Sequence, residues 1–134
     1  MAGETVQRAG IATDDVIVGK HVYGSLYGVP RDKAGDESYL RDLVLKAVKA
    51  AGATLLDLRS WVVPGKKGGV SVIAIVLESH IAIHTWLEYG YATVDVYTCG
   101  EHTDPWKAWQ VILEGLNPKK HVVHYSDRSQ LPGV

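Results

Sequence analysis

One stretch of the chain, residues 70 to 100, constrains the fold more than any other. It opens with an apolar run, Val70 to Leu77, that is rich in β-branched residues and interrupted only by a serine. A run of this kind predicts a strand covered on both faces, and therefore a strand in the middle of a sheet. Two further strands are expected from Ile81 to Trp86 and from Tyr91 to Thr98, with a turn at Glu88 to Gly90 between them.

Side chains that can do chemistry lie within this predicted sheet, and burying them costs free energy unless they are hydrogen-bonded or used. Taken singly, each has an ordinary interpretation. Ser79 lies in a turn, where serine usually bonds to nearby backbone, and no GxSxG elbow surrounds it. Cys99 alone is typical of a small buried hydrophobic residue. The local pattern therefore leaves the role of both residues open.

His80 and His84, with Glu78 or Glu88 nearby, have an alternative interpretation as ligands of a metal ion. Residues four apart on a strand, however, are separated by about 13 Å, which is too far to share one ion unless the strand bends. We therefore predict no metal site.

The rest of the chain supplies two helices and three more strands. Residues 1 to 15 are polar and patternless, and we expect a mobile arm there. After a loop at residues 28–36, a helix capped by Asp36 is predicted to run to about Ala51, with one apolar face: Leu40, Leu43, Val44, Ala47, Val48 and Ala51. A second helix begins at Asp104-Pro105 and is expected to place an apolar stripe on the sheet: Trp106, Trp109, Ile112, Leu113 and Leu116. The remaining strands are expected at Val16 to Tyr27, Thr54 to Val63 and His121 to Tyr125.

This order, β-α-β-β followed by β-β-α-β, predicts an α+β protein of one domain, residues 1–134. The expected architecture is a two-layer sandwich, a mainly antiparallel sheet with both helices on one face. Because two helices cover only one face, we expect a second subunit near the other.

Composition excludes several classes of function. Fourteen basic and fifteen acidic residues give a net charge of −1, and no basic stripe interleaves with aromatic residues, so nucleic-acid binding is not expected. No apolar run approaches the length of a membrane span, and we expect no membrane association. The single cysteine cannot form an internal disulfide, and a reducing cytoplasmic setting is the natural expectation.

The segment ESHIAIHTWLEYGYATVDVYTCG, residues 78–100, resembles the core of the prokaryotic S-adenosylmethionine decarboxylase family, whose pattern is close to ESHxxIHTWPExxYAxxDxxTCG. The resemblance continues through Asp104 to Ala108, reaches back to Gly69-Val70-Ser71 and Gly19-Lys20-His21, and covers roughly residues 18 to 125. Leu87 departs from the pattern, since the family usually has proline there.

The resemblance implies a self-cleaving proenzyme. Ser79 would attack the carbonyl of Glu78, and the chain would separate into residues 1–78 and 79–134, which stay associated, with Ser79 converted to a pyruvoyl group that binds substrate as a Schiff base. Ser71 matches the position that stabilises the ester-forming intermediate, and we expect it to reach Ser79 by the chain folding back. His84 matches the proton acceptor in processing, and Cys99 matches the proton donor in decarboxylation. Relatives pair two processed protomers, with active sites at the subunit boundary.

The start GKHVYGSLYG and the segment SVIAIVLESHIAIHTW are similar to an archaeal branch of pyruvoyl-dependent arginine decarboxylases, which implies conversion of L-arginine to agmatine in polyamine biosynthesis. Glu88 matches a substrate-binding carboxylate, and carboxylates suit a guanidinium. The chain has no Phe, and Val62 stands where a phenylalanine that stacks on adenine is usual, although Trp61, Tyr23 and Tyr27 could stack a purine instead. S-adenosylmethionine and ornithine therefore remain open as substrates, as does an uncleaved metabolite-binding module without catalysis.

Overall fold

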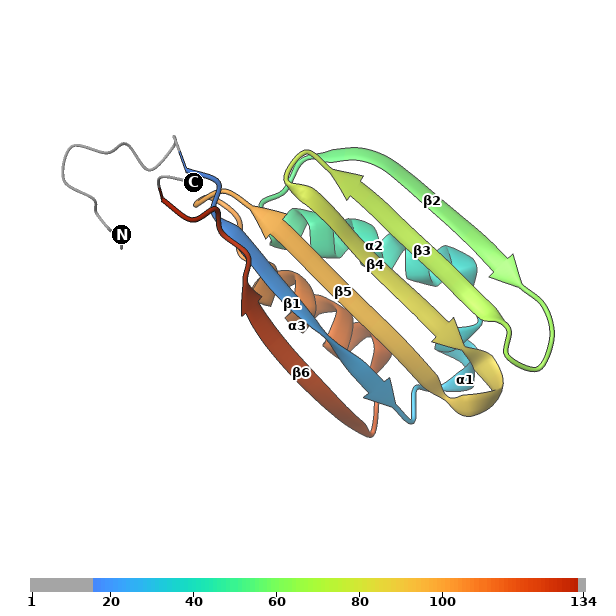
Figure 1. Ribbon diagram of the computed structural model, residues 1–134. Helices are drawn as coiled ribbons and strands as arrows, with labels where there is room; N and C mark the ends of the chain where they lie inside the picture. The colour runs from blue at the N-terminus through green and yellow to red at the C-terminus, as the bar shows by residue number, and fades with distance from the viewer. Residues whose placement is uncertain (1–15, 133–134) are drawn as a thin grey trace.

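The computed structural model describes residues 16–132, so the arm predicted at residues 1–15 lies outside the described residues. Six strands form one sheet, and the helices lie behind it (Figure 1). In chain order the elements are β1 (Gly19–Tyr27), α1 (Arg31–Ala34), α2 (Glu37–Ala50), β2 (Leu55–Val63), β3 (Gly69–Val76), β4 (Ser79–Trp86), the 3-10 turn η2 (Leu87–Tyr89), β5 (Tyr91–Cys99), α3 (Pro105–Leu116) and β6 (Lys120–Asp127).

The strand order across the sheet is β2-β3-β4-β5-β1-β6, and every neighbouring pair is antiparallel. β3, the apolar run that opens the central stretch, lies inside the sheet as predicted, and β4 and β5 follow it through short connections. β1, the first strand in the chain, inserts between β5 and β6. The predicted two-layer α+β sandwich is confirmed.

Both long helices begin where the sequence predicts, because an aspartate caps each of them. The Asp36 carboxylate accepts the Tyr39 N–H at 3.0 Å, and the Asp104 carboxylate accepts the Trp106 N–H at 3.0 Å. The apolar stripe predicted for α2 is buried against the sheet: Leu40, Leu43, Val44, Ala47, Val48 and Ala51. Burial of this helix layer against one face of the sheet forms the core.

Four details differ from the sequence-based predictions. β1 begins at Gly19 rather than Val16, and the loop expected after it contains the one-turn helix α1. β4 begins at Ser79 rather than Ile81, because Ser79 already pairs with its neighbours in β3 and β5. Trp106, expected to face the sheet, is 44% exposed and stacks on Tyr125 of β6, since it lies in the first turn of α3 beyond the buried stripe.

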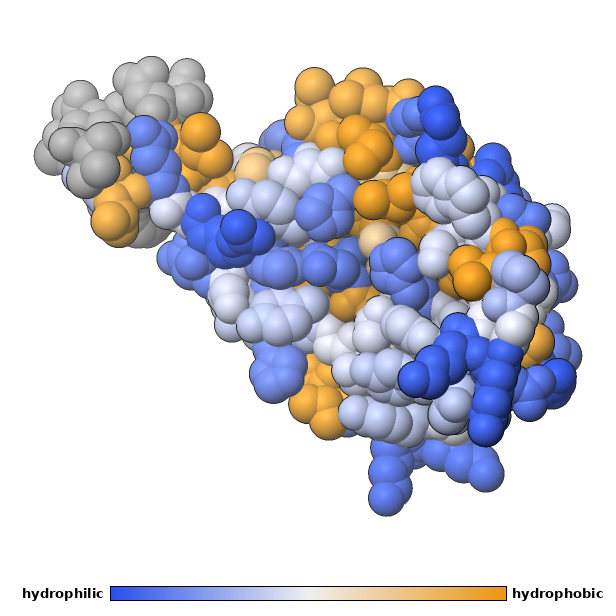
Figure 2. Space-filling view, turned by 45° about the vertical axis from the view of Figure 1, so that its right-hand side comes forward, coloured by the Kyte–Doolittle hydropathy of each residue, from blue (hydrophilic) through white to orange (hydrophobic). Residues whose placement is uncertain are grey.

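The other face of the sheet carries polar and aromatic side chains instead of an ordinary solvated surface; we call it the open face. It contains four histidines, two serines and several tyrosines at alternate positions of β1, β3, β4, β5 and β6: His21, His80, His84, His124, Ser25, Ser71, Tyr23, Tyr91 and Tyr97. Figure 2, an oblique view, shows apolar patches interrupted by polar residues. Among residues 16–132, no helix has the length and apolar character needed to cross a membrane.

Candidate active site

Ser79 lies at the start of β4, directly after the two-residue turn Leu77-Glu78 that joins β3 to β4. Its φ of 141° is in a region that L-residues rarely adopt, and only one other described non-glycine residue, Asn117, has a positive φ. A residue held in such a conformation costs about 1–3 kcal/mol, which the surrounding ladders must offset. The backbone is therefore strained at the residue where the sequence predicts cleavage.

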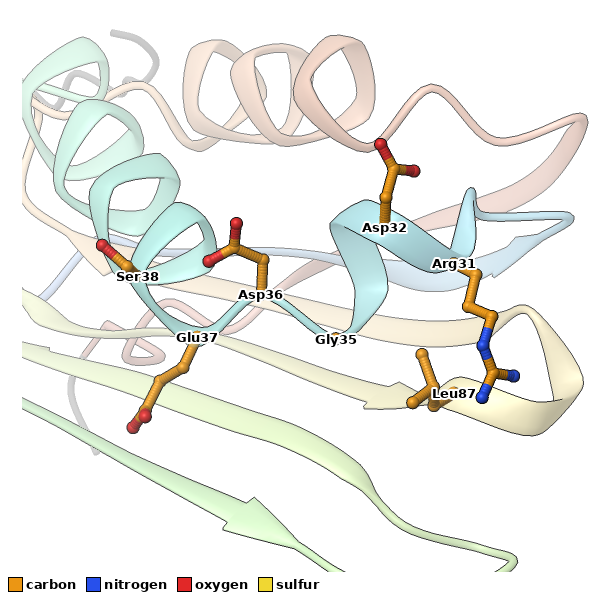
Figure 3. A pocket seen from close by; sticks show the side chains of 7 residues that line it. All are labelled: Arg31, Asp32, Gly35, Asp36, Glu37, Ser38 and Leu87. Carbon is orange, nitrogen blue, oxygen red and sulfur yellow. The ribbon is translucent and has the colours of Figure 1, made fainter.

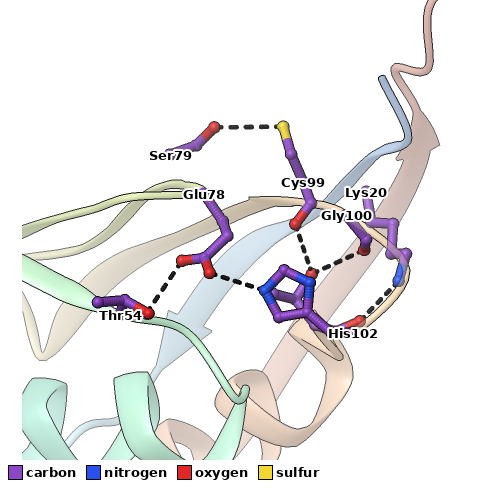
Figure 4. Close-up of polar contacts among 8 residues, drawn as sticks. Lys20, Thr54, Glu78, Ser79, Cys99, Gly100 and His102 are labelled. Carbon is purple, nitrogen blue, oxygen red and sulfur yellow. Dashed lines mark hydrogen bonds and ion pairs between the residues drawn. The ribbon is translucent and has the colours of Figure 1, made fainter. Parts of the chain in front are cut away.

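Cys99 meets this turn through both its side chain and its backbone. Ser79 Oγ lies 3.4 Å from Cys99 Sγ (Figure 4). The Cys99 N–H donates to the Glu78 carbonyl oxygen at 2.8 Å. A backbone N–H aimed at a carbonyl polarises it and stabilises negative charge that develops on its oxygen. The Glu78 carbonyl thus accepts from a fixed donor and is directly followed in the chain by the Ser79 hydroxyl, the candidate nucleophile. The fold brings Glu78, Ser79 and Cys99 together.

The Glu78 side chain is buried, with 8% of its surface exposed, and its carboxylate is held from two sides (Figure 4). Oε1 accepts the Thr54 N–H at 3.0 Å, and Oε2 lies 2.7 Å from His102 Nε2. Burial alone would raise the pKa of Glu78, but the hydrogen bonds from Thr54 and His102 outweigh it and hold the pKa below its ordinary value. Because the ionised carboxylate only accepts hydrogen bonds, His102 Nε2 carries the proton.

Because folding lowers the pKa of Glu78, its ionised carboxylate stabilises the folded state above about pH 4.5, its ordinary pKa. This stabilisation is lost as the pH falls through the lower pKa of the folded state. In an uncleaved Ser79→Ala background, Glu78→Gln is expected to reduce the free energy of unfolding at pH 7 by roughly 1 kcal/mol, because neutral hydrogen bonds replace charge-assisted ones. Chemical denaturation between pH 7 and pH 3 measures the difference, which should shrink in acid. A difference that stays constant or grows in acid contradicts this; Glu101→Gln, at an exposed neighbouring position, is the control.

A cavity of about 470 Å³ opens beside Cys99 and is lined by residues 16–18 and 99–102. Two residues before Cys99, Tyr97 lies on the same face of β5. Interaction with the Cys99 side chain, together with burial, raises the pKa of Tyr97, and nearby Arg128 only partly opposes this. The Tyr97 hydroxyl therefore remains protonated at neutral pH, and the thiol has a protonated neighbour.

Ser71 and His84 form a second group at a distance from the first. The two residues pair across β3 and β4, and His84 Nδ1 lies 2.8 Å from Ser71 Oγ. This pair lies five register positions from the pairing of Val76 with Ser79, which is about 16 Å along the strands. The fold of one chain thus brings Ser71 to His84 but brings neither of them to Ser79.

Between the two groups, the open face carries a charged cluster that the sequence does not reveal. The Asp95 carboxylate lies 2.6 Å from His21 Nε2 and 3.6 Å from His80 Nε2. Partial burial raises the pKa of Asp95, but hydrogen bonds from His80 and His21 outweigh this and lower it. A groove of about 510 Å³ runs over this cluster to His84 and His124. Only the register of β1, β4 and β5 brings these side chains together, so no local motif marks them.

Glu88 lies in η2, beyond the end of β4 that is opposite to Ser79. Its side chain is 51% exposed, and its Oε2 accepts from the Arg31 guanidinium at 3.2 Å. Arg31 also borders an open hollow of about 850 Å³ between α1, the start of α2 and Leu87 (Figure 3). Two of the acids in this hollow already have structural partners, since Asp36 caps α2 and Glu37 accepts from the Ser60 hydroxyl.

Comparison with known proteins shows the family to which this chain belongs. The family of S-adenosylmethionine decarboxylase matches residues 20–129. A protein of Aeropyrum pernix named arginine decarboxylase proenzyme is 68% identical over 117 residues, 87% of this chain and 89% of that protein. A protein of the same name from Hyperthermus butylicus is 58% identical over 122 residues, 91% of this chain and 86% of its own length.

A solved structure also shares the fold. The adenosylmethionine decarboxylase of Aquifex aeolicus is 35% identical, with a TM-score of 0.77 over 87% of this chain and 95% of its own. The sequence matches and the shared fold lead to the same conclusion: this chain belongs to the S-adenosylmethionine decarboxylase family.

Proposed function

We propose that this chain is the proenzyme of a pyruvoyl-dependent arginine decarboxylase that cleaves itself between Glu78 and Ser79. The observation that carries the proposal is the strained turn, where the Glu78 carbonyl accepts the Cys99 N–H and the Ser79 hydroxyl adjoins the Cys99 thiol. Relatives at 58–68% identity named arginine decarboxylase proenzyme support the substrate.

The cleavage starts at Ser79. Its Oγ attacks the Glu78 carbonyl carbon, the C–N bond breaks as the C–O bond of an ester forms, and the hydroxyl proton passes to the freed nitrogen. The Cys99 N–H stabilises the oxyanion of the tetrahedral intermediate between the amide and the ester. Removal of the Ser79 Cα proton by a base then expels the Glu78 carboxylate and leaves dehydroalanine, whose hydrolysis releases ammonia. Residues 1–78 and 79–134 result, the second beginning with a pyruvoyl group.

The local geometry fits a pyruvoyl group at position 79. Cleavage breaks the bond between the Glu78 carbonyl carbon and the nitrogen of residue 79, so the unfavourable φ of Ser79 no longer exists once the pyruvoyl group has formed. When present, the group supplies an electrophilic carbonyl that condenses with the substrate amine and accepts the electrons released as CO₂ leaves. The Cys99 thiol adjoins this position and returns a proton to the substrate carbon. A thiol in this role must stay reduced, which supports a cytoplasmic location.

We propose that the base comes from a second copy of the chain. Because Ser71 and His84 lie about 16 Å from Ser79 in the same chain, they do not reach it without a large rearrangement. Two copies packed by their open faces would bring this pair to Ser79 of the partner, with His84 as the proton acceptor. The aromatic and charged side chains of the open face, uncovered in one chain, support such a homodimer.

Glu88 follows His84 on the same end of the sheet, so the same arrangement brings it to the partner's site. It already binds a guanidinium, that of Arg31, which supports a role in holding the side chain of arginine. Glu88→Ala is expected to raise KM for arginine about tenfold or more, with a smaller effect on kcat, because it removes binding rather than chemistry. Steady-state CO₂ release measures both constants; an unchanged KM removes Glu88 from the site. Glu114→Ala, an exposed carboxylate on α3, is the matched control.

Decarboxylation of S-adenosylmethionine is the second candidate, favoured by the likeness to the Aquifex aeolicus structure. Its purine would need an aromatic partner, for which the 55% exposed Trp61 and the 44% exposed Tyr27 are candidates. Purified protein supplied separately with carboxyl-labelled arginine, S-adenosylmethionine and ornithine distinguishes the substrates. We expect labelled CO₂ from arginine; release from another substrate alone reassigns the specificity. No release from any substrate, with an unbroken chain by mass spectrometry, indicates a metabolite-binding module.

A further inference from the structure

Glu78 is anchored at three points, two on its carboxylate and one on its backbone carbonyl. The carboxylate is bound by Thr54 and His102, and the carbonyl by the Cys99 N–H at 2.8 Å. Because its carboxylate is hydrogen-bonded on both oxygens, Glu78 cannot rotate freely about its side-chain bonds. This restrains the orientation of the peptide group between Glu78 and Ser79, whose carbonyl carbon the Ser79 hydroxyl attacks.

His102 is itself held in place by the loop that follows β5. Gly100 has a φ of +91°, and a Cβ there would meet His102 Cε1 at 2.8 Å, so the histidine ring lies directly over a residue that has no side chain. Thr103 Oγ1 donates to the Cys99 carbonyl at 3.0 Å, and the Thr103 carbonyl accepts from Lys20 Nζ at 2.6 Å (Figure 4). The loop is thus tied to both β5 and β1.

The exposure of His102 argues against a role in the core. Its side chain is 61% exposed, whereas the Glu78 side chain that it contacts is 8% exposed. Apolar packing does not require an imidazole at this position, and the ring covers a buried anion beside the scissile bond. Its evident contribution is the Nε2–H hydrogen bond to the carboxylate.

We propose that His102 is a positioning residue for self-cleavage, which holds Glu78 so that its carbonyl stays on the Cys99 N–H and within reach of the Ser79 hydroxyl. This inference rests on the proposed function. Positioning has a large effect on such reactions, because a displacement of about 1 Å costs roughly 10²-fold in rate. The step affected is the acyl shift from nitrogen to oxygen; the later elimination depends on the base.

The test measures the rate of cleavage of freshly purified or cell-free synthesised precursor by denaturing mass spectrometry. We expect His102→Ala to slow cleavage by roughly tenfold or more, and His102→Gln, whose amide N–H can still reach Glu78, to remain within about threefold of wild type. Glu114→Ala, at an exposed carboxylate on α3 away from the site, should cleave at the wild-type rate. Melting curves establish that each variant is folded.

Hydroxylamine distinguishes the acyl shift from elimination, since it attacks an ester and releases Glu78 hydroxamate and an unblocked Ser79. In hydroxylamine we expect the His102→Ala precursor to be cut roughly tenfold more slowly than the His84→Ala precursor, because its ester forms slowly whereas the ester of His84→Ala accumulates. Hydroxylamine cleavage of His102→Ala as fast as that of His84→Ala overturns the inference, as does wild-type speed in His102→Ala or an equal defect in His102→Gln.

If His102→Ala does not fold, variants of Glu78 test the same positioning role. Glu78→Gln keeps an acceptor for Thr54 and a partner for His102 and should cleave within about threefold of wild type, whereas Glu78→Ala should be roughly tenfold slower or more. Equal rates in the two overturn the inference. A wild-type chain that never cleaves would instead overturn the proposed function, so the two failures are distinguishable.

Discussion

Ser79→Ala is expected to yield one uncut chain with no detectable decarboxylation, the largest effect that any single substitution should have. The alanine has no oxygen to attack the Glu78 carbonyl, and without cleavage no electrophilic group forms at position 79. Denaturing mass spectrometry should find the wild type as two fragments, 1–78 and 79–134, the second without a free amino group. Labelled-CO₂ release measures the accompanying loss of activity.

Ser38→Ala serves as the matched control, because Ser38 is an exposed serine in the first turn of α2, on the helix side of the sheet and away from the turn. It should cleave like the wild type. Cleavage of the Ser79→Ala chain at the same bond, or a wild-type fragment with an ordinary amino-terminal serine, contradicts the mechanism. Ser79→Cys is informative too, since a thiol in the same place can still attack and should give slow cleavage rather than none.

His84→Ala is expected to slow cleavage by about 10²–10⁴-fold, the usual loss for a general base, and a partner chain should restore it. In a heterodimer of His84→Ala with Ser79→Ala, the first chain supplies an intact Ser79 and the second an intact His84. The His84→Ala chain should then be cut at nearly the wild-type rate, while its partner stays whole. Two different affinity tags isolate the heterodimer, and mass spectrometry identifies which chain is cut.

The control for this experiment pairs His84→Ala with a chain carrying both Ser79→Ala and His84→Ala. That heterodimer contains no intact His84 and should stay uncut. If the first heterodimer also stays uncut, or if no heterodimer can be isolated, the base does not come from a second copy. The distance of about 16 Å between the Ser71–His84 pair and Ser79 would then require a rearrangement within one chain.

The parts of the fold that follow from local patterns were predictable. Asp36 and Asp104 cap helices because an aspartate before an apolar repeat offers its carboxylate to the first turn. The apolar run of β3 predicted a central strand covered on both faces. β3 does lie inside the sheet, but in one chain its open face is uncovered, with Ile75 41% exposed. The family was predictable because its motif lies in one continuous segment, residues 78–100. The two-layer fold was predictable because the order of helices and strands can be read along the chain.

The arrangement of the site was only partly predictable, since it depends on register. Ser79 and Cys99 meet because both lie at the same end of the sheet, which the strand lengths already indicate. The sequence suggested that Ser71 folds back onto Ser79, but the hairpin register pairs it with His84 instead. His102 carried no recognisable signal, because its partner, Glu78, is 24 residues away and belongs to another loop.

The position of β1 has a consequence for the protein after the proposed cleavage between Glu78 and Ser79. β1 would then belong to the fragment 1–78 but is hydrogen-bonded between β5 and β6, which would both belong to 79–134, and β3 of the first fragment would pair with β4 of the second. Neither fragment keeps a continuous sheet alone. The uncut precursor folds as a single molecule, but the cut protein, once denatured, must reassemble from two chains in a bimolecular step whose yield depends on concentration. The lifetime of the mature protein is then governed by how slowly the interleaved strands separate.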